Sequence, residues 1–387
     1  MCIKNMEAEM KERFKKIKTS SKGKGNAVQV FKTPNFMNNI YDVCMVMENG
    51  LFIRKDHSCT MLYKMVQDSV FKKDCATKFF EVLRSYDFEY RFFYYGINDV
   101  YLEVFIKPEN KNKLTDIELA KQIEHIEQDM FLKLSKCGIT LTTVWLDERL
   151  RLIHKRICRY YDAADKNIMN YQKDVAAWKE DITLKAYIPD ENTLQIGDYR
   201  IKMAFIREFP QTRIKECIQQ LLSIEDIECV MIQYSPIGDD CLKAFFHSNY
   251  MGCDNELRKL QTKNPVLYKM LSDNTLSDTR TYCFMGISIL YTQKDSINGT
   301  TSNKESHNVL IKEQSNFGID GYGATISDYQ TNPIRTFTEF IPLGEWNYNQ
   351  CRLFLNEDIK NTIPIMNQNP LAIQEDYSTS NLNEFFM

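Results

Sequence analysis

The sequence predicts an α+β fold in two lobes, each a mixed or antiparallel sheet with helices on one face. Three observations support this prediction. Short runs rich in aromatic and β-branched residues alternate with amphipathic helical segments. An Asn-Gly pair at Asn49-Gly50 separates two apolar runs, which is typical of a β-hairpin. The run at 281–292 is nearly all apolar and β-prone, as in a central strand.

The composition is that of a globular protein. Apolar residues make up 43% of the chain and charged residues 26%. The net charge of −3 gives no general attraction to nucleic acid or anionic lipid. No apolar run approaches the roughly 18–20 residues that a membrane span needs. None of the 12 cysteines forms a CxxC pair, so we expect buried thiols in a reduced, cytosolic compartment rather than zinc ligands.

Residues 1–35 form a basic lead that we expect to be partly disordered. Its first half can form an amphipathic helix at 6–17, with lysines crowded into the later turns. Such a helix could also contact an anionic membrane surface or nucleic acid. The charged start is unlike a secretory signal.

The first lobe spans residues 36–159, and its pattern predicts the order β-β-α-β-β-α-β-α. Gly138 is expected to end the longest helix, and Asp147 to cap the last one. The expected elements are a hairpin at 41–58, a helix at 70–86, two aromatic strands within 88–107, a helix at 114–136, a strand at 139–145 and a helix after Asp147.

A polar helical linker at 160–181 separates the lobes, and the second lobe spans 182–365. Its order of elements predicts a ferredoxin-like split β-α-β arrangement with a helical insertion at 239–276. A polar tail follows at 366–387. The expected strands lie at 182–189, 194–198, 199–208, 228–234, 281–292 and 323–327, and the expected helices at 214–222 and 304–313.

The segment at 329–365 contains two prolines with apolar neighbours, Pro342 and Pro364. A proline bars the preceding residue from the α region, and Gly344 permits a backbone turn that other residues resist. We therefore predict a short helix, a sharp turn at Pro342-Leu343-Gly344, a second short helix and a stop.

This segment resembles the end of the amino-terminal domain in the type IV secretion and conjugative-transfer ATPases of the VirB-four (TraE-like) class, just before their ATP-binding motor. Phe354 stands where that family would have Leu or Met. The helix after Asp147 also resembles the family through Glu148, Arg149, Leu150 and Ile153, although the family's following Tyr-Arg-Pro-Gly turn has no counterpart. The matching positions of the segment are Pro342, Leu343, Gly344, Arg352, Asn356, Glu357 and Pro364.

The resemblance implies a non-catalytic assembly module that contacts channel proteins and neighbouring subunits. Its implied partners are other secretion or conjugation channel proteins, a motor ATPase on a separate chain, and further copies of itself. Its implied location is cytoplasmic, at the periphery of the membrane. Whether the motor lies on another chain or was lost stays open.

A P-loop ATPase needs the string GxxxxGK[ST] to hold phosphates, and this string does not occur in the sequence. The nearest glycine-rich stretches are Gly23-Lys24-Gly25 and 318–323, and neither fits the pattern. We therefore predict no hydrolysis of ATP by the P-loop route, no catalytic residue, no cofactor and no metal.

Other candidate sites have simpler interpretations. His125 and Asp129 could form a weak cation site but are more typical of a solvated helix face. His154 is more typical of an interior histidine than of a base. The group Asp239, Asp240, Cys241 and His247 is best interpreted as a capped helix start rather than a nucleophile with its base.

The alternative function is an unrelated enzyme or nucleic-acid-binding protein whose site is not recognisable from sequence. The aromatic run FEYRFFYY could stack bases, but the same alternation is typical of a half-buried strand. Direct binding of nucleic acid is therefore not expected.

Overall fold

The structure is a computed structural model of the whole chain. It describes residues 29–32, 42–67, 75–86, 88–96, 99–107, 115–161, 177–179, 182–190, 192–208, 218, 221–224, 226–236, 282–294, 325–328, 332–343 and 351–355.

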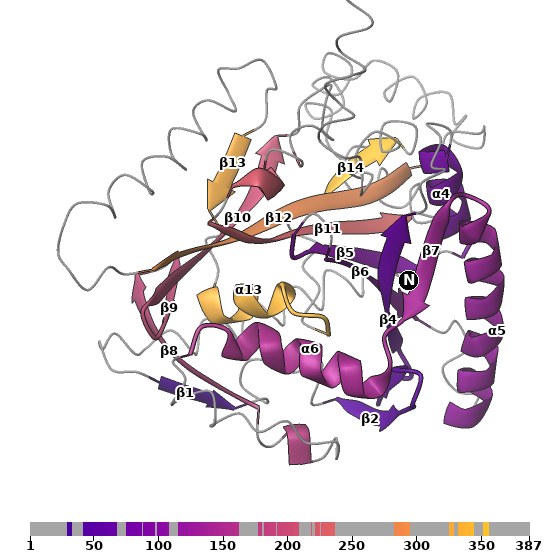
Figure 1. The fold of residues 1–387 in the computed structure, drawn as a ribbon, viewed down its shortest axis with the longest axis horizontal. Helices are drawn as coiled ribbons and strands as arrows, with labels where there is room; N and C mark the ends of the chain where they lie inside the picture. The colour runs from indigo at the N-terminus through magenta and orange to yellow at the C-terminus, as the bar shows by residue number, and fades with distance from the viewer. Residues whose placement is uncertain are drawn as a thin grey trace, which may run out of the picture.

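The prediction of an α+β fold is confirmed, because the described chain forms one large antiparallel sheet with helices packed against it (Figure 1). The described helices are α4 (Cys75–Arg84), α5 (Asp116–Ser135), α6 (Leu146–Cys158) and α13 (Pro333–Glu339). The strands are β1 (Gln29–Lys32), β2 (Val43–Val46), β3 (Phe52–Arg54), β4 (Cys59–Gln67), β5 (Glu89–Tyr94), β6 (Val100–Ile106), β7 (Ile139–Thr143), β8 (Thr183–Asp190), β9 (Thr193–Ile196), β10 (Tyr199–Glu208), β11 (Ile227–Pro236), β12 (Tyr282–Lys294), β13 (Thr325–Asp328) and β14 (Arg352–Leu355).

The first half of the chain contains a β-α-β-β-α-β unit made of β4, α4, β5, β6, α5 and β7. Its strands lie in the order β7-β4-β6-β5, with every neighbouring pair antiparallel. The unit's first and third strands are thus central, which is the strand order of a split β-α-β arrangement. The sequence pattern had missed β4, the strand that begins this unit.

The second half repeats this strand order. Strands β10 to β13 lie in the order β13-β10-β12-β11, again antiparallel throughout. The connections that would carry the helices of this unit lie largely outside the described residues, so its ferredoxin-like assignment stays a prediction. The two units meet edge to edge, because β5 pairs with β11 over five residues from Tyr90 to Tyr94. One continuous sheet therefore joins the two predicted lobes.

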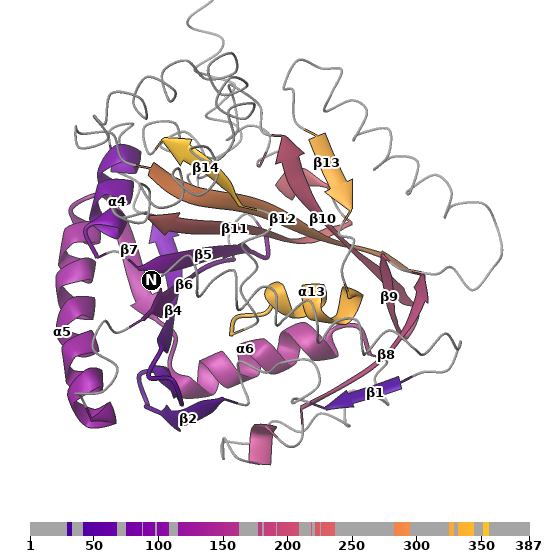
Figure 2. The ribbon, with the colours of Figure 1, turned by 180° about the vertical axis from the view of Figure 1, so that it is seen from behind.

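The described helices lie against both faces of this sheet, not one. Successive residues of a strand point to opposite faces. In β6, Leu102 belongs to the core beneath α4 and α5, whereas Tyr101 belongs to the core beneath α6 and α13. The reason is that β6 is buried at all seven positions, so neither face can be left to solvent. Both views show α6 and α13 side by side across the sheet from α5 (Figures 1 and 2).

Helix starts were predicted with mixed success. The long helix α5 has Thr115 as its N-cap, whose side chain and that of Glu118 form a capping box. Helix α6 begins two residues earlier than expected, after Trp145, and no side chain caps it. Asp147 therefore lies inside the first turn, where its charge complements the helix dipole.

The segment at 329–365 differs from the prediction in its second part. The expected first helix is α13, and the turn follows it with Leu343 at φ +81°. Arg352, however, begins strand β14, which pairs with β12, so a strand replaces the expected second helix at this point. The start of β12, which extends beyond its pairing with β10, supplies the backbone hydrogen-bonding partners of β14. The local sequence of β14 does not indicate this pairing. Gly344, Asn356, Glu357 and Pro364 lie outside the described residues, as do the expected insertion at 239–276, the helix at 304–313 and both chain ends.

None of the described helices is long and apolar enough to cross a membrane.

Tyrosines packed into the fold make the free energy of unfolding depend on pH in the alkaline range. Burial raises the pKa of Tyr63, Tyr94, Tyr95 and Tyr160 above the ordinary value of 10.0. The folded chain therefore keeps protons that the unfolded chain releases. Stability is present below about pH 10 and falls above it, by about 1.4 kcal/mol per pH unit for each tyrosine. Chemical denaturation between pH 9 and 11, followed by tyrosinate absorbance, measures this loss; an unchanged midpoint would contradict it.

Candidate functional site

A cluster of charged side chains is buried on the sheet face covered by α6 and α13. Arg91 comes from β5, Glu103 from β6 and Arg149 from α6, and each has no exposed surface. The antiparallel register places Arg91 directly opposite Glu103. Thr60 from β4 is equally buried and completes the group, which we call the Glu103 cluster.

Glu103 is the acceptor at the centre of the Glu103 cluster. Its Oε2 accepts from Nε of Arg91 at 2.8 Å and also pairs with Nη2 of that residue. Its Oε1 accepts from Oγ1 of Thr60 at 2.9 Å and lies 3.6 Å from Nη2 of Arg149. The same Oε1 accepts the backbone N–H of Leu343 at 2.9 Å. Hydrogen bonds from several donors hold this buried carboxylate fixed in position.

Arg149 connects α6 to the first hairpin. Its Nη1 donates to the carbonyl oxygens of Gly50 and, at 2.8 Å, of Thr60. The guanidinium also lies over the ring of Phe52, 4.4 Å from the centroid. Burial lowers the pKa of Arg149, and the charge of Glu103 opposes that shift. The position that the family resemblance singled out as part of a helix pattern thus has a structural role in this chain.

Three side chains of the first half hold the turn after α13. Nη1 of Arg91 donates to the carbonyl of Glu339 at 3.3 Å, and the hydroxyl of Tyr95 donates to that of Phe340 at 2.8 Å. Glu103 accepts from Leu343, as described above. The family-like residues Pro342 and Leu343 are therefore buried and anchored to the sheet of the first half.

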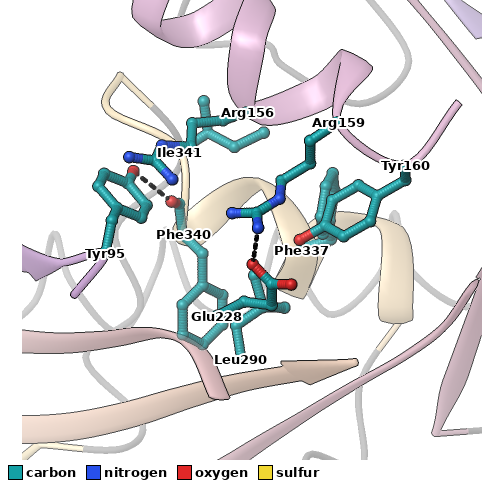
Figure 3. Close-up of a pocket in the computed structure, with 9 residues that line it drawn as sticks. All are labelled: Tyr95, Arg156, Arg159, Tyr160, Glu228, Leu290, Phe337, Phe340 and Ile341. Atoms are coloured by element: carbon teal, nitrogen blue, oxygen red, sulfur yellow. Dashed lines mark hydrogen bonds and ion pairs between the residues drawn. The ribbon is translucent and has the colours of Figure 1, made fainter. Parts of the chain in front are cut away.

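A small pocket adjoins this turn (Figure 3). Its empty volume is about 230 Å³, including space open to solvent. Arg159 pairs with Glu228 across it, and Arg156 pairs with Asp99 at 2.8 Å while stacking on Tyr95. The lining residues are Tyr95, Arg156, Arg159, Tyr160, Glu228, Leu290, Phe337, Phe340 and Ile341.

The charged groups of this pocket are paired with one another or with neighbouring side chains. Glu228 is engaged by Arg159 and also accepts from the hydroxyl of Thr292 at 3.1 Å. Burial raises the pKa of Tyr160 and of the neighbouring Cys229 thiol, so neither group ionises near neutral pH. A cysteine nucleophile or a catalytic base instead needs a pKa close to the working pH.

The histidines considered from sequence do not form sites in the described part of the chain. His125 is exposed on α5, and Asp129 instead accepts from Tyr86 and Lys133 at 2.7 and 2.6 Å. His154 is half-buried, with Nε2 3.3 Å from Sγ of Cys158. The described residues contain no group of three or more ligands that could hold a metal ion. The group around Cys241 lies outside them.

Strand β5, which carries the aromatic run, does not present a base-stacking surface. Five of its six residues are buried, and only Glu89 at its start is partly exposed. Its rings pack within the two cores instead, for example Phe92 against Phe79. The half-buried-strand interpretation is therefore closer to the structure, which buries the strand further than predicted.

The comparisons with known proteins identify no family. A scan against protein-family models gave no match, and a search of curated proteins found no significant match.

Sequence reasoning missed the Glu103 cluster, although a signal was present. Arg91 and Glu103 are charges of opposite sign, each flanked on both sides by apolar or aromatic residues within its strand. They lie nearly symmetrically about the loop that joins these strands, so a tight antiparallel connection places them opposite each other. The contact with Leu343, which is 240 residues away in sequence, left no such signal.

Proposed function

We propose that this chain is a non-catalytic docking module of a conjugation or type IV secretion ATPase. It would contact the channel complex and neighbouring subunits at the cytoplasmic face of the membrane. The observation that carries this proposal is the contact between Glu103 and Leu343, which anchors the family-like turn in the first half. In the family that the turn resembles, the same segment leads into the motor.

The anchoring explains how such a module would hold a motor in place. Side chains of the first half fix the turn after α13, and one sheet joins the halves through β5 and β11. A motor connected to or bound at Leu343 would therefore be attached at a fixed position. Rigid placement is what a docking module contributes, because it removes the entropic cost of orienting the motor.

The absence of a phosphate-binding string supports a non-catalytic role. The 387 residues contain no GxxxxGK[ST], and the described charged groups of the Glu103 cluster and the pocket engage one another. Holding and positioning, rather than turnover, is the function that these contacts favour.

Association with motor and channel proteins tests the proposal. The purified chain is mixed with the P-loop ATPase and the cytoplasmic channel subunits encoded beside its gene, and the mixture is resolved by size-exclusion chromatography. We expect co-elution with at least one of them and no ATP hydrolysis by the chain alone. Hydrolysis by the isolated chain, or separate elution from every candidate, would contradict the proposal.

Two surface variants sharpen this experiment. Trp145 is 58% exposed beside the hairpin that contains edge strand β2, and Leu132 is equally exposed on α5. Large exposed aromatic residues are frequent hot spots of interfaces. If docking uses the sheet edge, Trp145→Ala weakens co-elution and Leu132→Ala does not. Equal effects of the two variants would place the contact elsewhere.

A further inference from the structure

Arg54, at the end of β3, is a buried cation with two guanidinium nitrogens that make no hydrogen bond to the described residues. It is only 6% exposed, and its Nε and Nη2 are buried without a hydrogen-bond partner among the residues that the structure describes. Its guanidinium lies over the ring of Phe105, 5.0 Å from the centroid. A guanidinium does not lose its proton in proteins, so Arg54 cannot escape this environment by becoming neutral.

The surroundings of Arg54 leave its charge poorly balanced. Two carboxylates attract the charge of Arg54: Glu103, which is engaged by Arg91 and Arg149, and Asp56, which is exposed and accepts hydrogen bonds from Ser58. An aromatic face offsets only part of the cost of burying a charge. Buried donors without partners usually indicate a water molecule or an ion, and only an anion also balances the charge.

The two unused atoms form a defined recognition edge. Nε and Nη2 lie on the same side of a guanidinium and together bind oxygens of a carboxylate or phosphate. Arg91 uses this same pair of atoms on Glu103. Arg54 thus presents the edge that its neighbour has already filled with a carboxylate.

We propose that the Nε–Nη2 edge of Arg54 binds a small oxyanion of the carboxylate or phosphate class. Lys107 borders the site, since its Nζ lies 5.1 Å from the centroid of the same Phe105 ring while it pairs with Glu89 at 2.8 Å. The side chain of Lys107 is 53% exposed, so it can move aside to admit the ligand from solvent. The site does not depend on the docking function proposed above.

Thermal unfolding in matched salts tests the site. Inorganic phosphate and acetate are each compared with chloride at constant ionic strength. A ligand that binds only the folded chain raises the midpoint, and we expect a rise of about 2 °C with at least one oxyanion. A rise with phosphate alone assigns the phosphate class, and a rise with acetate alone the carboxylate class. No rise with either overturns the proposal.

Two variants locate the effect. Arg54→Lys keeps the charge but lacks the Nε–Nη2 edge, so the rise should disappear. Arg151→Lys makes the same change at an exposed arginine of α6 and should keep it. A rise that survives Arg54→Lys places the anion elsewhere and overturns the assignment. Should Arg54→Lys fail to fold, the Nε–H resonance of Arg54 in the wild-type chain decides: it must shift with the oxyanion and not with chloride.

Discussion

Replacing Glu103 by glutamine is expected to lower the free energy of unfolding by about 3–5 kcal/mol. The substitution keeps the shape of the side chain but removes the only carboxylate that pairs with Arg91 and Arg149 among the described residues. Two guanidinium groups without exposed surface then lose their counter-charge. Removing one partner of a buried ion pair costs far more than the pair itself contributes, because the remaining charge stays buried. Urea denaturation measured at neutral pH gives the difference.

Glu89→Gln is the matched control for this substitution. Glu89 begins the strand that also carries Arg91, and it pairs with Lys107, whose side chain is half exposed. Exposed ion pairs contribute at most about 1 kcal/mol, so this variant should be nearly as stable as the wild type. Equal losses in the two variants would show that burial does not decide the cost.

The Glu103 variant also bears on the docking proposal. The amide of glutamine offers one oxygen where the carboxylate offers two, so Arg91 and Leu343 compete for it. We expect the turn after α13 to loosen before the sheet does. Hydrogen exchange of the amide of Leu343 would report that change separately from global unfolding.

Local signals predicted most of the elements of the first half. The Asn49-Gly50 hairpin, helix α5 and the aromatic strands each carry their own pattern. Strand β4 is not predicted from the sequence, because the predicted hairpin ends at residue 58 and no further strand is expected before the helix at 70–86. His57, at φ +59°, instead forms a second tight turn, and the chain continues directly into β4. A positive φ at a residue other than glycine is uncommon and is not readable from composition.

Contacts between distant segments account for what sequence could not predict. Strand β14 forms because β12 provides its hydrogen-bonding partner. Its four residues, RLFL, are too few to predict a strand from sequence alone. The candidate site depends on the same kind of contact, since Glu103 and Leu343 lie 240 residues apart in sequence. The family-like turn was visible as a motif, but its buried anchor was not.

Gly50→Ala is expected to cost about 3 kcal/mol or more, because two separate penalties add. Gly50 has φ +78°, where side chains are strained, and a Cβ would lie 2.2 Å from the backbone carbonyl oxygen of Val144. That carbonyl cannot move freely, since it lies one residue before the N-cap of α6. The carbonyl of Gly50 itself accepts from Arg149, so the displaced turn also disturbs the Glu103 cluster.

Gly96→Ala separates the two penalties. Gly96 also has a positive φ, +157°, but a Cβ there would meet nothing within 4 Å. It therefore retains the conformational penalty without the contact, and its cost should stay near 1–2 kcal/mol. Urea denaturation measures the loss in free energy of unfolding for each variant. The difference between the two losses is the cost of the close contact between the hairpin and the start of α6. If both variants lose the same stability, the hairpin can move away from α6, and the Arg149 contact with Gly50 does not fix their positions.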